Sequence, residues 1–184
     1  MINLNNVSFS YGDKKILENF NLKIEASERI CLFGESGKGK TTVLRLILGL
    51  ETPDSGNTVI QGNASVVFQE NRLLPFETVL GNIRTVKGDE EKARELLEKF
   101  GLSDYAEKYP RSLSGGMKRR VAIIRALCSE FDFLVLDEPF AGLDKENIEL
   151  AAQIINEYSK DKAIILVTHS EWEASLLGAK IVNI

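Results

Sequence analysis

The sequence Ile30-Cys31-Leu32-Phe33-Gly34-Glu35-Ser36-Gly37-Lys38-Gly39-Lys40-Thr41 joins a short apolar run to a glycine-rich turn. Two of its glycines, Gly34 and Gly39, are separated by four residues, and the second is followed by a lysine and a hydroxyl residue. Glycines let a backbone wrap round a phosphate with its N–H groups pointing inward, and the lysine reaches the β- and γ-phosphates. The pattern predicts a phosphate loop at residues 34–41, with Thr41 as a Mg²⁺ ligand and Thr42 beside it.

The flanking sequence supports this prediction. Residues 30–33 are typical of a strand, and residues 39–50 carry Val43, Leu44, Ile47 and Leu48 at helical spacing. A phosphate loop needs this strand–loop–helix arrangement, because the positive end of the helix dipole then faces the anion.

A second strand ends in two carboxylates. Residues 133–136 form a continuous apolar run, as expected for a parallel strand that is covered on both faces. Asp137 follows at the carboxyl edge of the sheet, where it would bind the metal, and Glu138 comes next, placed to polarise a water for attack on the γ-phosphate. An Asp-Glu-Pro triplet can also be an ordinary solvated turn, but the phosphate loop favours a hydrolytic site.

Composition sets limits on the function. The 184 residues suit one domain, and a net charge of −4 argues against general nucleic-acid binding. The longest apolar stretch, residues 43–50, contains Arg45 and is far shorter than the roughly 18 residues that span a bilayer. Cys31 and Cys128 lie in apolar runs, so we expect buried thiols rather than a disulfide. The N-terminal residues predict no secretion signal, and we expect a cytosolic protein.

The rest of the chain predicts an α/β fold. Strands alternating with helices in the second half imply crossover connections and a parallel sheet, while the start is antiparallel in character. Strand signals are absent from residues 70–112, and Ser114 is expected to cap a helix with its hydroxyl. The expected strands are residues 2–9, 22–33 with a break at 26–28, 59–60, 66–68, 163–167 and 179–184, and the further expected helices are 90–100 and 145–159.

Residues Leu113-Ser114-Gly115-Gly116-Met117 lie between the two nucleotide motifs, and with them the sequence resembles the ATP-binding cassette (ABC) family of ATPases. The guanine-reading Asn-Lys-x-Asp of GTPases is absent from the sequence. The resemblance implies a single ABC ATPase domain over residues 1–184, a phosphate-loop NTPase with a mostly parallel central sheet flanked by helices. It further implies a small antiparallel β subdomain and an inserted helical lobe at about residues 70–115.

The resemblance also assigns roles to single residues. Tyr11 is similar to the aromatic that stacks on adenine, Gln69 to the glutamine that joins the lobes and helps to hold Mg²⁺, and His169 to the switch histidine. Taken alone, each could be a turn aromatic, a polar strand end or a structural histidine, but all stand in the family's order. Residues 141–144, which end at Asp144, are similar to the loop that follows the hydrolytic acid in the family.

The family mechanism implies a pair of cassettes closed head to tail. ATP held by Lys40 of one subunit is then capped by Ser114, Gly115 and Gly116 of the other. Catalysis would rest on Lys40, Gln69 and His169, with Glu138 as the general base. ATP and Mg²⁺ are the implied ligands, and a homodimer is expected.

Two functions follow from the resemblance. In the first, the chain is a transporter subunit on the cytoplasmic face of the cell membrane, with separate transmembrane permease subunits and a solute-binding protein as partners. Residues 72–79 and 112–122 are most similar to importers of the nitrate, sulfonate and taurine type. Leu74, Pro75 and Phe76 could form an apolar groove for a membrane subunit or, equally, core of the helical lobe.

In the second function, the chain is a soluble ABC ATPase that acts on nucleic acid or the ribosome. Lys118, Arg119 and Arg120 could be cited for it, but they also fit the solvated or nucleotide-facing side of the signature helix. A regulatory or inactive cassette is a third possibility, which the intact motif residues argue against. We expect a transporter subunit and no nucleic-acid partner.

The sequence departs from the family pattern at several positions. Met117 replaces the usual Gln, Thr41 the usual Ser, and Ser170 the Asp that often follows the histidine. The stretch of residues 56–69 is short for this family, so the antiparallel subdomain is expected to be small. The chain ends at Ile184, and C-terminal helices are expected to be absent.

Overall fold

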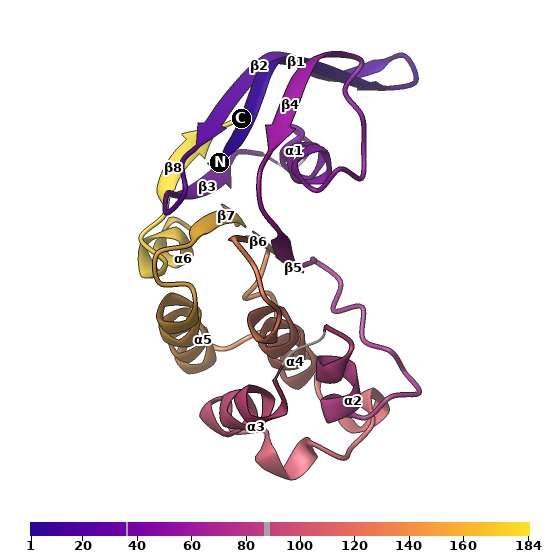
Figure 1. The fold of residues 1–184 in the computed structure, drawn as a ribbon, viewed down its shortest axis with the longest axis vertical. Coiled ribbons are helices and arrows are strands. Elements are labelled where there is room, and N and C mark those ends of the chain that lie inside the picture. Colours follow the sequence, from indigo (N-terminus) through magenta and orange to yellow (C-terminus); the bar gives the residue numbers. More distant parts are fainter. Residues whose placement is uncertain (36, 87–88) are drawn as a thin grey trace.

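A computed structural model describes residues 1–35, 37–86 and 89–184, which form two β-sheets with helices around them (Figure 1). One sheet has three antiparallel strands in the order β2-β1-β4, and the other has five parallel strands in the order β5-β6-β7-β3-β8. The strands are β1 (Ile2–Tyr11), β2 (Lys14–Ile24), β3 (Arg29–Phe33), β4 (Ser55–Ile60), β5 (Ala64–Val67), β6 (Phe133–Asp137), β7 (Ala163–Val167) and β8 (Lys180–Asn183). The predicted α/β class, with a parallel sheet and a small antiparallel one, is confirmed.

Six α-helices and two short 3-10 turns lie in the described ranges. They are α1 (Lys40–Ile47), α2 (Val79–Arg84), α3 (Glu90–Lys99), η1 (Ser103–Tyr105), η2 (Pro110–Ser112), α4 (Gly115–Cys128), α5 (Lys145–Tyr158) and α6 (Glu171–Leu176). In these ranges, no helix is both long and apolar enough to cross a membrane. Cys31 and Cys128 are buried free thiols, as predicted.

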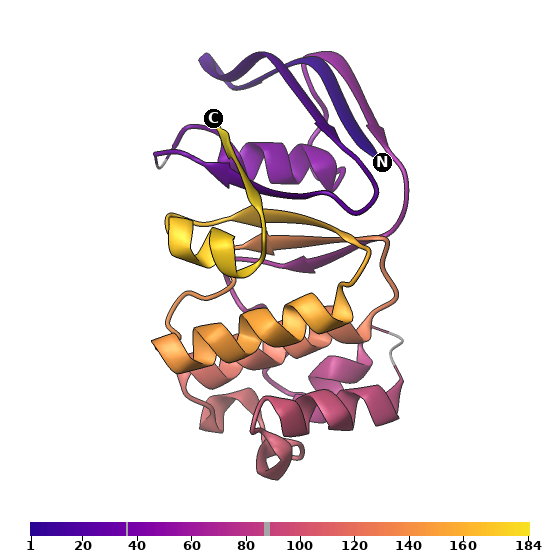
Figure 2. The ribbon, with the colours of Figure 1, turned by 90° about the vertical axis from the view of Figure 1, so that its left-hand side faces the viewer.

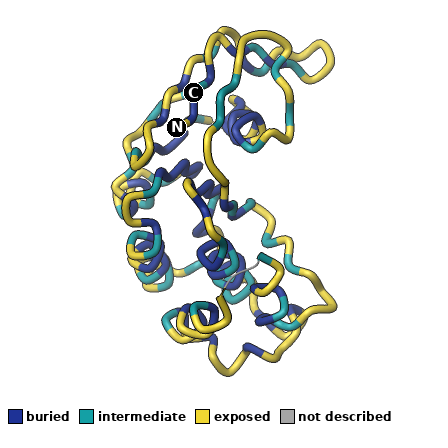
Figure 3. Tube along the Cα trace, viewed as in Figure 1, coloured by how far each residue is buried: buried dark blue, intermediate teal, exposed yellow. Residues whose placement is uncertain are grey.

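The parallel sheet divides the core in two, because successive side chains of a strand point to opposite faces. In β6, Leu134 and Leu136 pack among α3, α4 and α5, while Val135 packs with α1 and the antiparallel sheet. All five residues of β6 are buried, which matches the continuous apolar run in its sequence. Figure 3 shows the buried residues gathered in the central parallel strands and on the helix faces that are turned toward them.

Helices α2 and α3 follow β5 and pack against α4, and η1 packs against α3, at the end of the molecule that lies away from the antiparallel sheet (Figure 2). No strand occurs in the described part of residues 70–112, as predicted. Helix α4 therefore has one side on the parallel sheet and another on the added helices.

Side chains cap most of these helices. Thr78, Asp89, Ser114, Asp144 and Ser170 each accept a hydrogen bond from a main-chain N–H in the first turn of the helix that follows. Such a cap satisfies one of the free amides at a helix start and fixes where the helix begins. The predicted cap at Ser114 is confirmed, with its hydroxyl accepting from Met117 N at 3.2 Å.

The two strands expected around Gly62 form and belong to different sheets, because β4 pairs with β1 and β5 pairs with β6. Two details differ from the sequence prediction. Strand β2 begins at Lys14 rather than Leu22, since its polar first half pairs along β1 through several bulges and carries little apolar periodicity. The short helices α2 and α6 were not predicted, because six residues give too few turns for a periodic signal.

Candidate functional site

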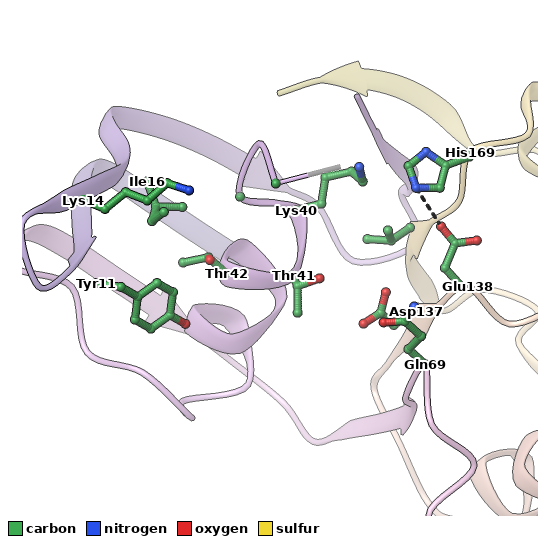
Figure 4. Close-up of a pocket in the computed structure, with 13 residues that line it drawn as sticks. Tyr11, Lys14, Ile16, Lys40, Thr41, Thr42, Gln69, Asp137, Glu138 and His169 are labelled. Carbon is green, nitrogen blue, oxygen red and sulfur yellow. Dashed lines mark ion pairs between the residues drawn. The ribbon is translucent and has the colours of Figure 1, made fainter. Parts of the chain in front are cut away.

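A cavity of about 380 Å³ lies between the phosphate loop and the carboxyl ends of β6 and β7. Figure 4 shows Lys40 and Thr41 on one side, with Asp137, Glu138 and His169 facing them. Its lining residues are Tyr11, Lys14, Ile16, Gly37, Gly39, Lys40, Thr41, Thr42, Gln69, Asp137, Glu138, Val167 and His169. Ten of the predicted site residues thus meet in one place, although they come from distant parts of the sequence.

The phosphate loop leaves the start of α1 open. The cap residue of α1 is Gly39, with φ 100°, and among the described residues the structure shows no side-chain cap hydrogen bond at the start of this helix. A Cβ at Gly39 would also lie 3.0 Å from Ile16 Cγ2. Glycine is required here by both the left-handed backbone and the close contact. The free amides and the positive helix end are therefore available to an anion in the cavity.

Lys40 is held at the floor of the cavity. Its side chain is buried, and Nζ donates to Gly34 O at 2.6 Å and to Glu35 O at 2.9 Å. These bonds extend the side chain back over the loop and leave one of its three ammonium donors for a bound anion.

Asp137 and Glu138 continue from β6, where the strand reaches the cavity. Glu138 has φ 48°, a left-handed conformation that costs energy in a residue with a side chain. Its N–H donates to Val167 O at 2.9 Å, so the strained residue is tied to β7. Glu138 Oε1 is buried and has no hydrogen-bond partner among the described residues, although His169 Nε2 lies 3.4 Å away. Glu138 thus lines the cavity and keeps one unsatisfied carboxylate oxygen beside His169.

The surroundings alter the proton affinity of both carboxylates. Burial raises the pKa of Asp137 above its usual 3.8, and the charges of Arg119 and Lys40 oppose this effect. Burial also raises the pKa of Glu138 above 4.5, and the acidic neighbour Glu173 raises it further. A higher pKa makes Glu138 a better proton acceptor, as a general base requires.

Tyr11 lies at the outer end of the cavity and is 44% exposed. Its hydroxyl donates to Glu51 Oε1 at 3.3 Å, and its ring meets Phe9 edge to face at 4.9 Å between centroids. The ring is thus supported on one side. Lys14 was not predicted to line the cavity, but it pairs with Tyr11 across the β1–β2 turn, and that hairpin pairing is the signal that would have located it.

Several predicted residues lie outside the cavity. Gly34 and Glu35 contribute carbonyl oxygens that hold Lys40, and Lys38 is exposed without lining the cavity. Ser36 lies outside the described residues.

The signature residues Ser114, Gly115 and Gly116 do not line the cavity either. They form the start of α4, where a Cβ at Gly116 would lie 3.3 Å from Gly142 O. Asp144 caps α5, and the main-chain N–H of Asn147 lowers the pKa of its carboxyl. Asp144, like the signature residues, does not line the cavity of its own chain.

The basic cluster on α4 is not a surface patch, contrary to one prediction. Arg119, expected on a solvated or nucleotide-facing side, is only 2% exposed and is surrounded by main-chain oxygens. Arg120 is half-buried and donates to Phe100 O at 2.7 Å. Helical periodicity could not predict this, because a charged side chain at a core-facing position looks like an interruption of the apolar face.

The residues suit a magnesium ion that also binds phosphates. Thr41, Gln69 and Asp137 line the same cavity and offer a hydroxyl, an amide and a carboxylate oxygen. In the described ranges, no cluster of three or more His, Cys, Asp or Glu residues could hold a metal on its own. Mg²⁺ is commonly bound by one or two carboxylates together with substrate phosphates, and this donor set fits that pattern.

The family model for the ABC transporter matches residues 17–141 of the chain. This range covers the phosphate loop, Gln69, the signature residues and both carboxylates. The chain belongs to the ABC transporter family. An aliphatic sulfonates import ATP-binding protein of Rhodococcus jostii is 38% identical over 188 residues, covering 98% of the chain and 69% of that protein. A thiamine import ATP-binding protein of Haemophilus influenzae is 39% identical over 202 residues, covering 97% of the chain and 91% of that protein.

Solved ABC cassettes share the fold. A dimeric ATP-binding cassette in a post-hydrolysis state, bound to ADP and Pi, superposes with a TM-score of 0.88 at 29% identity, covering 100% of this chain and 94% of that one. The predicted ABC resemblance is confirmed, and with it the ATP-hydrolysing class of the chain.

Proposed function

We propose that this chain is the nucleotide-binding subunit of an ABC importer, which hydrolyses ATP to power the passage of a solute through separate transmembrane subunits. The observation that carries the proposal is the single cavity in which Lys40, Asp137, Glu138 and His169 meet. The family match and the importer names of two relatives support it.

ATP binding follows from the open start of α1. The phosphates accept hydrogen bonds from the loop amides and from Lys40, and Tyr11 stacks on the adenine at the outer end of the cavity. Thr41, Gln69 and Asp137 hold Mg²⁺, which when bound supplies positive charge to the phosphate oxygens. Residues 34–42 act together as the phosphate cradle.

Hydrolysis is assigned to Glu138. Its free Oε1 accepts a proton from the attacking water, and its raised pKa favours that transfer. His169, whose Nε2 lies 3.4 Å from this oxygen, positions the carboxylate and would contact the γ-phosphate of a bound ATP. Lys40 stabilises the charge that develops on the phosphate oxygens.

A second copy of the chain completes the site. Ser114, Gly115 and Gly116 begin a helix, so their amides and hydroxyl make a second phosphate cradle for the ATP of the facing subunit. Asp144 lies in the loop that would meet the partner. The dimeric state of the similar cassette supports this arrangement, and we propose a homodimer.

An exposed apolar surface marks the side for the membrane subunits. Phe76 is 90% exposed and Leu74 46%, which favours the groove over the core of the helical lobe. Pro75, Phe76, Tyr109 and Arg111 surround a hollow of about 310 Å³. We propose that a cytoplasmic helix of a permease packs here, so that the chain lies on the cytoplasmic face of the membrane. A solute-binding protein would complete the importer.

The alternative, a soluble ATPase for nucleic acid or the ribosome, finds less support. The cluster at residues 118–120 would be its contact surface, but Arg119 is buried and Arg120 is half-buried. A phosphate backbone requires accessible positive charges.

The test is phosphate release from Mg-ATP by the purified chain. We expect turnover that falls at least about 100-fold in Lys40→Ala, because the phosphates lose their buried positive charge. Lys160→Ala, at an exposed position, serves as the control and should retain the parent rate. Equal rates in the parent and Lys40→Ala would contradict the proposal.

A further inference from the structure

Arg119 is a buried arginine whose hydrogen bonds join two functional segments to α4. It lies in α4, is 2% exposed and directs its described hydrogen bonds to five main-chain carbonyls and one side-chain amide. Arginine is rarely buried this completely without a special reason, because its guanidinium must find partners for five N–H donors.

One side of the guanidinium holds the segment that carries the catalytic carboxylate. Nε donates to Pro139 O at 2.8 Å, and Nη2 donates to Asp137 O at 2.8 Å. Nη2 also donates to Glu138 O. The carbonyls on both sides of the strained Glu138 backbone are therefore fixed by the same side chain.

The other side holds the segment that carries Gln69. Nη1 donates to Phe68 O at 2.5 Å, to Gln69 O at 3.2 Å and to Asn71 Oδ1 at 3.4 Å. The same guanidinium plane thus spans the end of β6 and the chain that leaves β5. Both segments are attached to α4, whose first turn is the signature sequence.

The backbone at Glu138 needs such support. A left-handed conformation at a residue with a side chain is strained and persists only where its surroundings determine it. Three donors of one rigid group bind the carbonyls of residues 137–139, which is the region where that strain is located.

We propose that Arg119 is a positioning residue for ATP hydrolysis, which aims the Glu138 carboxylate at the cavity and fixes it relative to Gln69. This inference rests on the proposed function, since it concerns the rate of the same reaction. Arg119 does not line the cavity and acts only through the two backbones that it holds.

The planar fork is essential to this role. A guanidinium presents five donors in fixed directions, whereas a lysine ammonium presents three donors at a single point. Lysine at this position would keep the charge but could not bridge both segments. A glutamine would lose the charge and most of the donors.

The experiment compares Arg119→Lys and Arg119→Gln with the parent chain. Arg125→Gln is the matched control, because Arg125 also lies in α4 and donates to the main-chain oxygens of Arg72 at 2.8 Å and Asn71 at 3.0 Å. None of the described hydrogen bonds of Arg125 goes to residues 137–139. Each protein is assayed for kcat, for the dissociation constant of a fluorescent ATP analogue and for its thermal midpoint.

We expect kcat to fall about 100-fold in Arg119→Gln and about 10-fold in Arg119→Lys, because small displacements of a catalytic group cost this much in rate. The dissociation constant for the ATP analogue should stay within about 3-fold of the parent, since the phosphate loop is untouched. Arg125→Gln should retain kcat within about 2-fold even if its thermal midpoint falls as far as that of the Arg119 variants.

Three results would overturn the inference. The first is a folded Arg119→Gln that keeps the parent kcat. The second is a loss of kcat that matches the loss in Arg125→Gln or the fraction of unfolded protein. The third is the failure of both Arg119 variants to fold, which would make the residue purely structural. A parent chain without phosphate release would contradict the proposed function itself, and the inference would fall with it.

Discussion

Replacing Glu138 by Gln changes one oxygen of the carboxylate into an amide nitrogen and preserves the shape of the side chain. The main-chain bonds of residue 138, to Val167 O and from Ala141 N, do not involve the side chain and should remain. The left-handed backbone is available equally to Glu and Gln. We therefore expect a folded protein that binds ATP but lacks the general base.

The size of the effect follows from the role of the lost group. A positioned general base contributes about 100- to 10,000-fold to the rate of a reaction. Glu138 Oε1 is the buried oxygen without a hydrogen-bond partner in the described site, and His169 Nε2 lies 3.4 Å from it. An amide there cannot accept the proton of the attacking water, so kcat should fall by at least about 100-fold.

The assay measures phosphate release at saturating Mg-ATP together with the dissociation constant of a fluorescent ATP analogue. Glu130→Gln is the control, because it makes the same chemical change at an exposed residue away from the cavity. ATP binding should change by less than about 3-fold in both variants. Size-exclusion chromatography with light scattering should show Glu138→Gln as a stable dimer in Mg-ATP, because the closed pair of subunits cannot hydrolyse its nucleotide.

A Glu138→Gln protein with a kcat within about 3-fold of the parent would refute this reasoning. Loss of ATP binding together with activity would also refute it, since the carboxylate would then be needed to bind ATP rather than to transfer a proton.

Three further predictions concern stability and binding. Burial raises the pKa of Glu138 in the folded protein, so its ionised form costs stability above that pKa. Glu138→Gln should therefore raise the thermal midpoint at pH 7–8, and the gain should vanish below pH 4.5, the usual glutamate value. A constant gain across this pH range would contradict it. Asn82 is fully buried, and its side chain accepts a hydrogen bond from Leu74 N at 2.6 Å and donates to three carbonyl oxygens. Asn82→Ala should therefore cost about 2 kcal/mol of stability and lower the thermal midpoint by about 4–8 °C. An unchanged midpoint would show that this network adds no stability. Phe76→Asp should leave the ATPase rate of the isolated chain unchanged but prevent co-purification of the membrane subunit, and retention of that subunit would exclude the Phe76 surface as its docking site.

Much of the fold followed from local sequence signals. The run at residues 133–136 predicts a fully buried strand, because a strand covered on both faces has a continuous apolar sequence. The helical spacing after the phosphate loop predicts α1, because a helix buried on one side has apolar residues at a helical period. Strand β2 begins earlier than predicted because its exposed, bulged half has no such apolar pattern. The pairing of β5 with β6 also required three-dimensional information, since parallel partners are far apart in the chain.

The candidate site was predictable where motifs fix the chemistry. The spacing of glycines, lysine and threonine predicts the loop around Lys40, and the apolar strand before Asp137 and Glu138 predicts their role once the loop is recognised; the cavity brings them together. Arg119 could not be assigned in this way, because its partners are main-chain oxygens whose positions depend on the folded backbone. The cavity residue Lys14 was missed for a similar reason, since only the hairpin pairing places it beside Tyr11.

The most direct test of the account is an affinity purification of tagged Glu138→Gln protein, with Mg-ATP, from detergent-solubilised membranes of the source organism. Mass spectrometry would identify the chains that co-purify. The account predicts a membrane protein with several transmembrane helices that is retained with Mg-ATP and absent when Phe76→Asp is added. Recovery of ribosomal or nucleic-acid-binding proteins, with no membrane chain, would contradict the transporter function.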